Sequence, residues 1–220
     1  MQAIATACVY FRRFYVLRSF RDVDPFLLAP TCIWLASKVE ESGSIQPTKL
    51  INAAVGALKK FPFLNQDLPI RQQLLQEAEF CMLEVMDCCL IVYHPYRTLN
   101  HMIQEMKNTG VRETEQLHAD AWRICNDSLR CDASLLYPPH LIAIAAIIVG
   151  TMLNGRDKDK EIKSWFADLA VDFEKVFEIQ QMIFGMYRIW KGFNEAEQLL
   201  PLMEKLPRPR QSMQMSKRES

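Results

Sequence analysis

Side chains that can perform catalytic or metal chemistry are present, but their spacing favours neither. None of the four histidines belongs to an HExxH pair, and no CxxC pair occurs among the seven cysteines, although such spacings are typical of metal sites. Glu84 and Asp87 lie at i and i+3, an ordinary arrangement for surface carboxylates on a helix. A glycine-rich phosphate loop and a GxSxG motif are also absent from the sequence. The sequence therefore predicts a protein that is not an enzyme and holds no metal or cofactor.

Composition and charge narrow the remaining classes of protein. The 220 residues include 26 basic and 26 acidic side chains, so bulk charge does not indicate a nucleic-acid binder. Hydrophobic residues make up 50% of the chain, which excludes disorder throughout. Only 7 glycines are present, which argues against the many tight turns of an all-β fold. The length fits one large domain or two small ones.

The cysteines indicate a reducing compartment. Their number is odd, and most lie among apolar neighbours at helical spacing, which is typical of free, buried thiols. The seven are Cys8, Cys32, Cys81, Cys88, Cys89, Cys125 and Cys131. We expect no signal peptide, because the chain opens directly into an amphipathic pattern. The longest apolar run, Leu141 to Val149, is far shorter than the roughly 20 residues that span a bilayer.

Hydrophobic spacing predicts an all-α fold. Apolar residues recur with the helical period nearly everywhere, and no alternating strand pattern is found. Asp24 and Pro25 suit the N-cap and first position of a buried central helix. The expected helices cover about residues 1–18, 24–41, 47–60, 69–90, 95–107, 113–130, 138–154, 160–172 and 174–191.

An internal repeat organises these helices into two copies. When the sequence is compared with itself at one fixed offset, residues along most of the first copy match residues of the second. A second offset, which allows for a gap in a loop, aligns the last helix of each copy. The first offset pairs Pro25 with Pro139, Leu27 with Leu141, Ala29 with Ala143 and Ile33 with Ile147, and the second pairs Gln76 with Gln180 and Phe80 with Phe184. The second copy has five expected helices, whereas the first has four. We therefore expect the first copy to expose apolar surface on its central helix and to be the less stable one.

Three motifs resemble the cyclin family. Residues 35–41, LASKVEE, are similar to the third-helix signature of the cyclin box. Residues 86–97, MDCCLIVYHPYR, and 135–139, LLYPP, resemble the cyclin of the Mediator kinase module. The resemblance covers about residues 1–206 and implies two tandem five-helix cyclin-box repeats, the first lacking its first helix. It implies a first cyclin box at 1–93 and a second at 94–206. The remaining residues, 207–220, are rich in Pro, Ser and Met with scattered basic side chains, so we expect a disordered tail there.

The resemblance also implies a function. Cyclins bind the N-lobe of a cyclin-dependent kinase and push its C-helix inward, so that a glutamate meets the lysine of the third strand and completes the ATP site. A cyclin of the Mediator kinase module implies a regulatory subunit that acts with other Mediator subunits in transcription by RNA polymerase II. It further implies a nuclear location and no direct contact with nucleic acid or membrane.

Residue by residue, the resemblance implies a kinase-binding pair at Lys38 and Glu79. Lysine offers only donors and a carboxylate only acceptors, so the two can hold both C=O and N–H groups of a helix end. The repeat places Met152 and Ile183 at the equivalent positions, which fits a first copy that binds and a second that supports. Nearby apolar candidates for the same surface are Val39, Leu83 and Met86, each of which also suits the core.

Two alternatives stay open on sequence grounds. The segment that links the copies contains Tyr93, His94, Tyr96 and Arg97; we favour a packed joint, and a docking groove is the other interpretation. A protein similar to general transcription factor B would also carry two cyclin-type repeats. Such a protein binds promoter DNA and should show a basic surface, so the neutral charge and the LASKVEE motif count against it.

Overall fold

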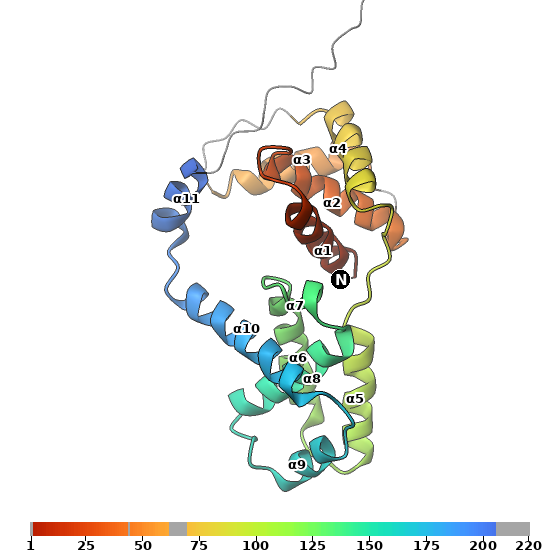
Figure 1. The fold of residues 1–220 in the computed structure, drawn as a ribbon, viewed down its shortest axis with the longest axis vertical. Helices are drawn as coiled ribbons and strands as arrows, with labels where there is room; N and C mark the ends of the chain where they lie inside the picture. The colour runs from red at the N-terminus through yellow and green to blue at the C-terminus, as the bar shows by residue number, and fades with distance from the viewer. Residues whose placement is uncertain (1, 44, 62–69, 206–220) are drawn as a thin grey trace, which may run out of the picture. The chain divides into compact units, whose positions relative to one another are not determined.

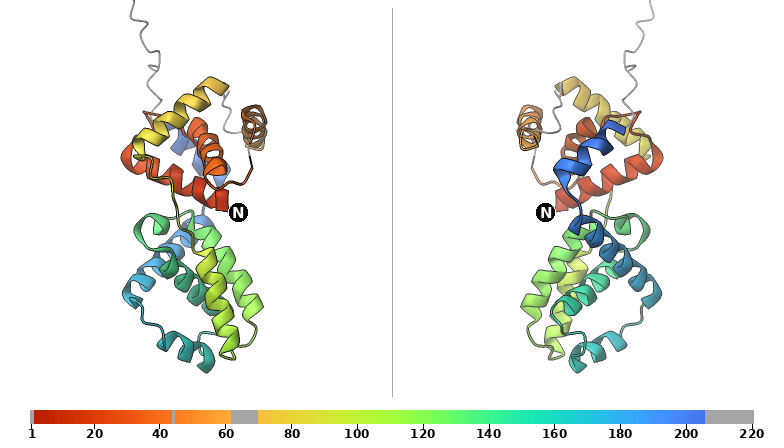
Figure 2. Two further views of the ribbon diagram at one scale, coloured as in Figure 1. Left: turned by 90° about the vertical axis from the view of Figure 1, so that its right-hand side faces the viewer. Right: turned by 90° about the vertical axis from the view of Figure 1, so that its left-hand side faces the viewer.

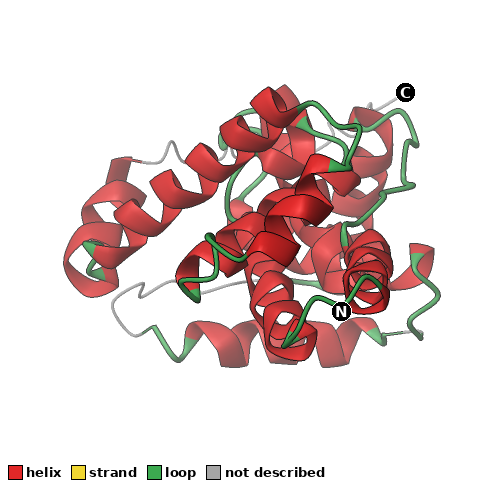
Figure 3. Cartoon of the chain, turned by 90° about the horizontal axis from the view of Figure 1, so that it is seen from below, coloured by secondary structure: helices red, strands yellow, loops and turns green. Residues whose placement is uncertain are grey.

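The computed structural model describes residues 2–43, 45–61 and 70–205 (Figure 1). These residues form helices joined by loops, and no strand occurs among them (Figure 3). The chain divides into two compact units, each described here by itself. One contains residues 2–91 together with 193–205, and the other contains residues 92–192. The predicted disordered tail at 207–220 lies outside the described residues.

The first unit is built around one central helix. Its helices are α1 (Gln2–Leu17), α2 (Pro25–Val39), α3 (Pro47–Leu58) and α4 (Gln72–Val85), with a π-helical turn η2 (Glu195–Leu199) and α11 (Leu200–Lys205) grouped beside them. Helix α2 packs against α1, α3 and α4 (Figure 1). It begins as predicted, because Oδ1 of Asp24 accepts a hydrogen bond from the N–H of Phe26 at 2.8 Å and Pro25 occupies the first turn.

The second unit repeats this plan with one more large helix. It contains α5 (Tyr96–Asn108), α6 (Thr114–Ser128), α7 (Ala133–Leu136), α8 (Pro139–Leu153), α9 (Lys160–Ala167) and α10 (Phe173–Lys191). The central helix α8 packs against α5, α6 and α10, and α5 and α6 run side by side (Figure 2). The buried side chains of α8, most of them Ala and Ile, lie around nearly the whole circumference of the helix. This is expected for a helix that is apolar on all sides.

Several helix ends differ from the predicted ones. Helix α4 ends at Val85 rather than near Leu90, because Asp87 and Cys88 adopt left-handed φ angles of 48° and 54°. Helix α9 ends at Ala167 rather than at 172. The sequence analysis missed α7, η2 and α11, which are short elements without a long periodic pattern. The two left-handed residues end the helix and change the direction of the chain.

Helix α1 fixes the segment that follows this change of direction. The hydroxyl of Tyr10 donates a hydrogen bond to the carbonyl oxygen of Leu90 at 2.5 Å, and Nη1 of Arg13 donates to that of Cys89 at 3.2 Å. These carbonyls are not part of a helix, so the two side chains supply partners that the backbone lacks there.

The two central helices differ in how far they are covered. In the second unit α5 packs on both α6 and α8, and Ile147 of α8 is 0% exposed. Ile33, the residue of α2 that the repeat pairs with Ile147, is 40% exposed. Ile4 on α1 is also exposed. In the described part of the first unit, the central helix and α1 therefore leave apolar surface exposed at these two positions.

The thiols are free but less uniformly buried than predicted. Only Cys32 and Cys125 are buried, whereas Cys88 and Cys89 are exposed because they lie in the segment after α4. Burial raises the pKa of Cys125 to about 12 and also raises the pKa of Cys32. The thiolate is the reactive form of cysteine. In the folded units, Cys32 and Cys125 are therefore protected from alkylation both by burial and by their raised pKa values.

We expect alkylation to report these differences. Iodoacetamide at mildly alkaline pH should label Cys88 and Cys89 first, and Cys32 and Cys125 only when their units open. In rising urea, Cys32 should react before Cys125, because Ile33, on the same central helix as Cys32, is 40% exposed, whereas Ile147 of the other central helix is 0% exposed. Peptide mass spectrometry after quenching measures each site, and a fully denatured sample provides the reference for complete labelling. Labelling of Cys125 before Cys32 would contradict the expected order of stability.

Candidate functional site

The structure brings Lys38 and Glu79 together. Lys38 lies in the last turn of α2 and Glu79 lies in the middle of α4. Nζ of Lys38 donates to Oε1 of Glu79 at 2.6 Å and to Oε2 at 2.8 Å. The lysine side chain is 43% exposed and that of the glutamate is 13% exposed. The two residues that the family motif singled out are thus one ion pair on the surface of the first unit.

Trp34 forms the floor of this pair, and sequence reasoning missed it. The Nζ atom of Lys38 lies 3.6 Å from the centroid of the Trp34 ring, within cation–π distance. The indole Nε1 donates a hydrogen bond to the carbonyl oxygen of Ile45 at 3.1 Å. The ring is itself buried in a cluster with Leu50 of α3 and Leu75 of α4. The signal available in the sequence was the i, i+4 spacing of Trp34 and Lys38 on one helix.

A second polar contact secures the end of α2. The hydroxyl of Thr6, which is buried on α1, donates to Oε1 of Glu40 at 2.6 Å. Glu40 is the C-cap residue of α2 and lies two positions after Lys38. The contact therefore ties α1 to the turn of α2 that carries the lysine.

The geometry defines what the pair can bind. An ammonium group has three N–H donors, and two of those of Lys38 are directed to Glu79. One donor is left for a carbonyl oxygen of a partner. Each carboxylate oxygen has more than one lone-pair site, so Glu79 can still accept from an N–H group. The pair is suited to recognise exposed backbone groups at the end of a helix, and charge strengthens both kinds of bond.

The apolar candidates differ in exposure. Val39 and Leu83 are partly buried and retain some surface. Met86 is 6% exposed and belongs to the core. Phe80, which follows Glu79, is exposed. Sequence reasoning used Phe80 only to align the repeat, yet it offers more accessible apolar area than Met86.

The second unit has no equivalent polar pair. The repeat places Met152 at the position of Lys38 and Ile148 at that of Trp34. Ile183, at the position of Glu79, is fully buried in α10. Three residues of the first-unit site are therefore replaced together by apolar ones, and the two units present different chemistry on equivalent helices.

Tyr96, in the linking segment, packs within the second unit. The ring of Tyr96 is buried and lies against Trp122, with centroids 4.7 Å apart, and its hydroxyl donates to Oδ1 of Asn126 at 2.8 Å. Tyr93 and Arg97 are exposed and His94 is partly buried. These contacts of Tyr96 lie within the second unit, and both interpretations of the linking segment, a packed joint and a docking groove, stay predictions.

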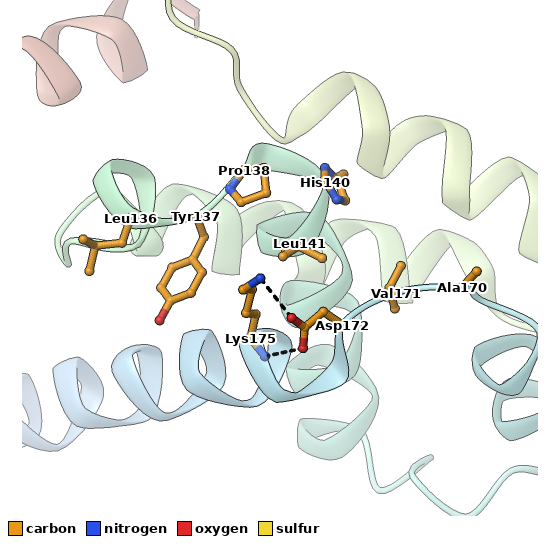
Figure 4. A pocket seen from close by; sticks show the side chains of 9 residues that line it. All are labelled: Leu136, Tyr137, Pro138, His140, Leu141, Ala170, Val171, Asp172 and Lys175. Atoms are coloured by element: carbon orange, nitrogen blue, oxygen red, sulfur yellow. Dashed lines mark hydrogen bonds and ion pairs between the residues drawn. The ribbon is translucent and has the colours of Figure 1, made fainter.

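A pocket of about 430 Å³ lies in the second unit (Figure 4). Its lining residues are Leu136, Tyr137, Pro138, His140, Leu141, Ala170, Val171, Asp172 and Lys175. Nζ of Lys175 lies 3.0 Å from Oδ2 of Asp172, and this contact lowers the pKa of Asp172 and raises that of Lys175. Oδ1 of Asp172 also accepts hydrogen bonds from the first N–H groups of α10. These polar groups serve the cap of α10, which explains their position without a ligand.

Metal binding and membrane insertion have no support in the described residues. Within the described ranges, no group of three His, Cys, Asp or Glu side chains is placed to hold a metal ion. In the same ranges, no helix is long and apolar enough to cross a membrane.

Comparison with known families identifies both units. Residues 1–91 match the family model of the cyclin N-terminal domain, and residues 94–204 match that of the cyclin C-terminal domain. The chain belongs to the cyclin family. The predicted family and all-α cyclin fold are therefore confirmed, and this cyclin is a member of a family of regulatory proteins.

Curated relatives of this cyclin are named Cyclin-C. It is 45% identical to Cyclin-C of Rattus norvegicus over 211 residues, which cover 95% of this chain and 73% of the relative. It is 46% identical to Cyclin-C of Drosophila melanogaster, over 95% of this chain and 76% of the relative. Identity to Cyclin-C of Caenorhabditis elegans is 37%, over 96% of this chain and 72% of the relative.

Solved structures share the fold of this cyclin at lower identity. A chain of the CAK complex of Chaetomium thermophilum bound to ATP-gamma-S matches with a TM-score of 0.67 and 18% identity, covering 94% of this chain and 65% of that one. A chain of the yeast RNA Pol II CTD kinase CTDK-1 complex matches with a TM-score of 0.63 and 19% identity, covering 84% and 58%. This cyclin thus spans about two thirds or less of the length of these structural neighbours.

Proposed function

We propose that this cyclin is the regulatory subunit that binds and activates a cyclin-dependent serine/threonine kinase of the Mediator kinase module. In this role it regulates transcription by RNA polymerase II in the nucleus. The observation that carries the proposal is the exposed Lys38–Glu79 pair on the first unit. Similarity to proteins named Cyclin-C, at 37% to 46% identity, supports the choice of kinase.

The proposed mechanism is mechanical rather than chemical. Kinase activation requires the C-helix to hold its glutamate against the lysine of the third strand, beside the ATP phosphates. In the proposal, the free N–H of Lys38 binds a backbone carbonyl of the kinase next to that helix. Glu79 accepts from a backbone N–H there, and the exposed ring of Phe80 adds apolar contact. The cyclin fixes the active position of the C-helix and supplies no group to phosphoryl transfer.

The proposed partners are the kinase and other Mediator subunits. Direct contact with nucleic acid is not part of the proposal, because the chain carries 26 basic and 26 acidic side chains and lacks the positive excess that phosphate binding favours. The alternative of a promoter-binding protein similar to general transcription factor B is included in the test below.

Reconstitution with purified components tests the proposal. The cyclin should bind the Mediator-module kinase and raise its activity on a peptide from the RNA polymerase II C-terminal domain. A pull-down from nuclear extract should recover the same kinase together with Mediator subunits. A kinase of the cell-cycle class serves as the comparison partner. Failure to bind or activate the kinase, or retention on promoter DNA at moderate salt, would overturn the proposal.

A further inference from the structure

We propose that Trp34 is a positioning residue for the kinase-binding lysine, an inference that rests on the proposed function of Lys38 and Glu79. The buried indole ring keeps the ammonium group of Lys38 in one position over its face. In that position, one N–H of the ammonium group points away from Glu79 and toward the partner. Trp34 acts through Lys38 and has little surface for direct contact, because it is 8% exposed.

The geometry around the ring supports this role. Lys38 is held on two sides, by the carboxylate of Glu79 at 2.6 and 2.8 Å and by the indole face at 3.6 Å. A flexible four-carbon side chain that is 43% exposed would otherwise sample several rotamers. Contacts on two sides select one of them, which is the condition for a directed hydrogen bond.

The ring is itself anchored in three directions. Its Nε1 donates to the carbonyl oxygen of Ile45 in the loop before α3, and its apolar edges pack against Leu50 and Leu75. The orientation of the ring therefore depends on α3 and α4 as well as on α2. A lysine seated on this ring takes its position from the packed centre of the first unit rather than from its own helix alone.

The second unit provides an internal comparison. Where the lysine and glutamate are replaced by Met152 and Ile183, the tryptophan is replaced by Ile148. An aliphatic side chain suffices to fill the equivalent position when no ammonium group lies above it. The aromatic face is present in the unit that also carries the charges.

The first test measures kinase affinity in a set of variants. Trp34→Leu, which removes the aromatic face, should weaken binding about three- to tenfold, and Trp34→Phe, which keeps a ring face but no N–H donor, should recover part of that loss. Leu50→Ala is the matched control, because it loosens one anchor of the ring but keeps both the aromatic face and the ammonium group, and it should therefore weaken binding less than Trp34→Leu. In a Lys38→Ala background, Trp34→Leu should have no further effect. The inference would be overturned if Trp34→Leu and Leu50→Ala lowered kinase affinity equally. It would also be overturned if Trp34→Leu lowered affinity as much in the Lys38→Ala background as in the native protein.

A second test needs no kinase. In protein labelled with ¹³C-lysine, the ring current of Trp34 should shift the Cε protons of Lys38 upfield, with the resonance assigned through Lys38→Arg. The shift should disappear in Trp34→Leu, persist in part in Trp34→Phe and survive in Leu50→Ala. An unshifted resonance in the native protein would overturn the positioning role. If Lys38→Ala leaves kinase binding intact while the shift is present, the proposed function fails and the seating of Lys38 on Trp34 stands.

Discussion

Replacing Lys38 and Glu79 together by alanine is expected to weaken binding to the cyclin-dependent kinase by about thirtyfold or more, and to lower kinase activation in parallel. The pair lies at the centre of the proposed contact, where truncation of a main binding residue costs about 2 kcal/mol or more. The fold should survive, since an ion pair with a lysine that is 43% exposed contributes little to stability. Affinity is measured by calorimetry or biolayer interferometry, and activation by phosphate transfer to a peptide.

Two further variants separate binding from stability. Lys107 and Glu115 form an exposed ion pair in the second unit, 3.8 Å apart, and their double alanine variant removes the same charges and should leave kinase affinity unchanged. Exchanging the charges as Lys38→Glu with Glu79→Lys keeps an ion pair but places acceptors where the kinase offers carbonyls. If that exchange restored full affinity, the pair would serve the fold alone, and kinase contact through it would be disproved.

The second large effect concerns the two central helices. Ile147→Ala should lower the free energy of unfolding of the second unit by about 2–5 kcal/mol, because it opens a cavity at a fully buried position. Ile33→Ala should change stability by less than about 1 kcal/mol, since Ile33 is 40% exposed and alanine has the higher helix propensity. Urea denaturation of both variants, followed by circular dichroism, measures the difference.

The pair is matched because both residues are isoleucines at equivalent positions of the repeat. Labelling of Cys32 and Cys125 reports which unit opens in each variant, since each thiol is buried in a different unit. Equal destabilisation by the two substitutions would show that Ile33 is packed as tightly as Ile147. The inference that the central helix of the first unit is partly uncovered would then be wrong.

Regular helices were predictable because their signals are local. The apolar period revealed the long helices, and Asp24 with Pro25 marked the start of α2. The end of α4 was not predictable, because neither an aspartate nor a cysteine is a residue type that requires a left-handed backbone conformation. Neither residue is glycine, and the cost of that conformation is met by contacts from α1, which is distant in sequence.

The candidate site was predictable only in part. The motif around Lys38 and the position of Glu79 led to the family, but their ion pair spans two helices and depends on how α2 packs against α4. Trp34 is an apolar residue of a buried helix, and its burial alone gives no sign of a further role. Its contact with the ammonium group of Lys38 is seen only in the structure, which shows the position of the ring. Met86 illustrates the opposite case, because helical spacing alone does not tell a surface methionine from a buried one.

The ion pair between Lys38 and Glu79 exists before any partner arrives, which has a kinetic consequence. Two free, long side chains would each lose rotamer entropy on being immobilised in a complex. Here folding of the first unit has already ordered them. An encounter with the kinase therefore starts from a fixed arrangement of donor and acceptors and needs no search by these side chains. The lifetime of the complex then depends on how well the surrounding apolar surface closes around the pair and excludes water.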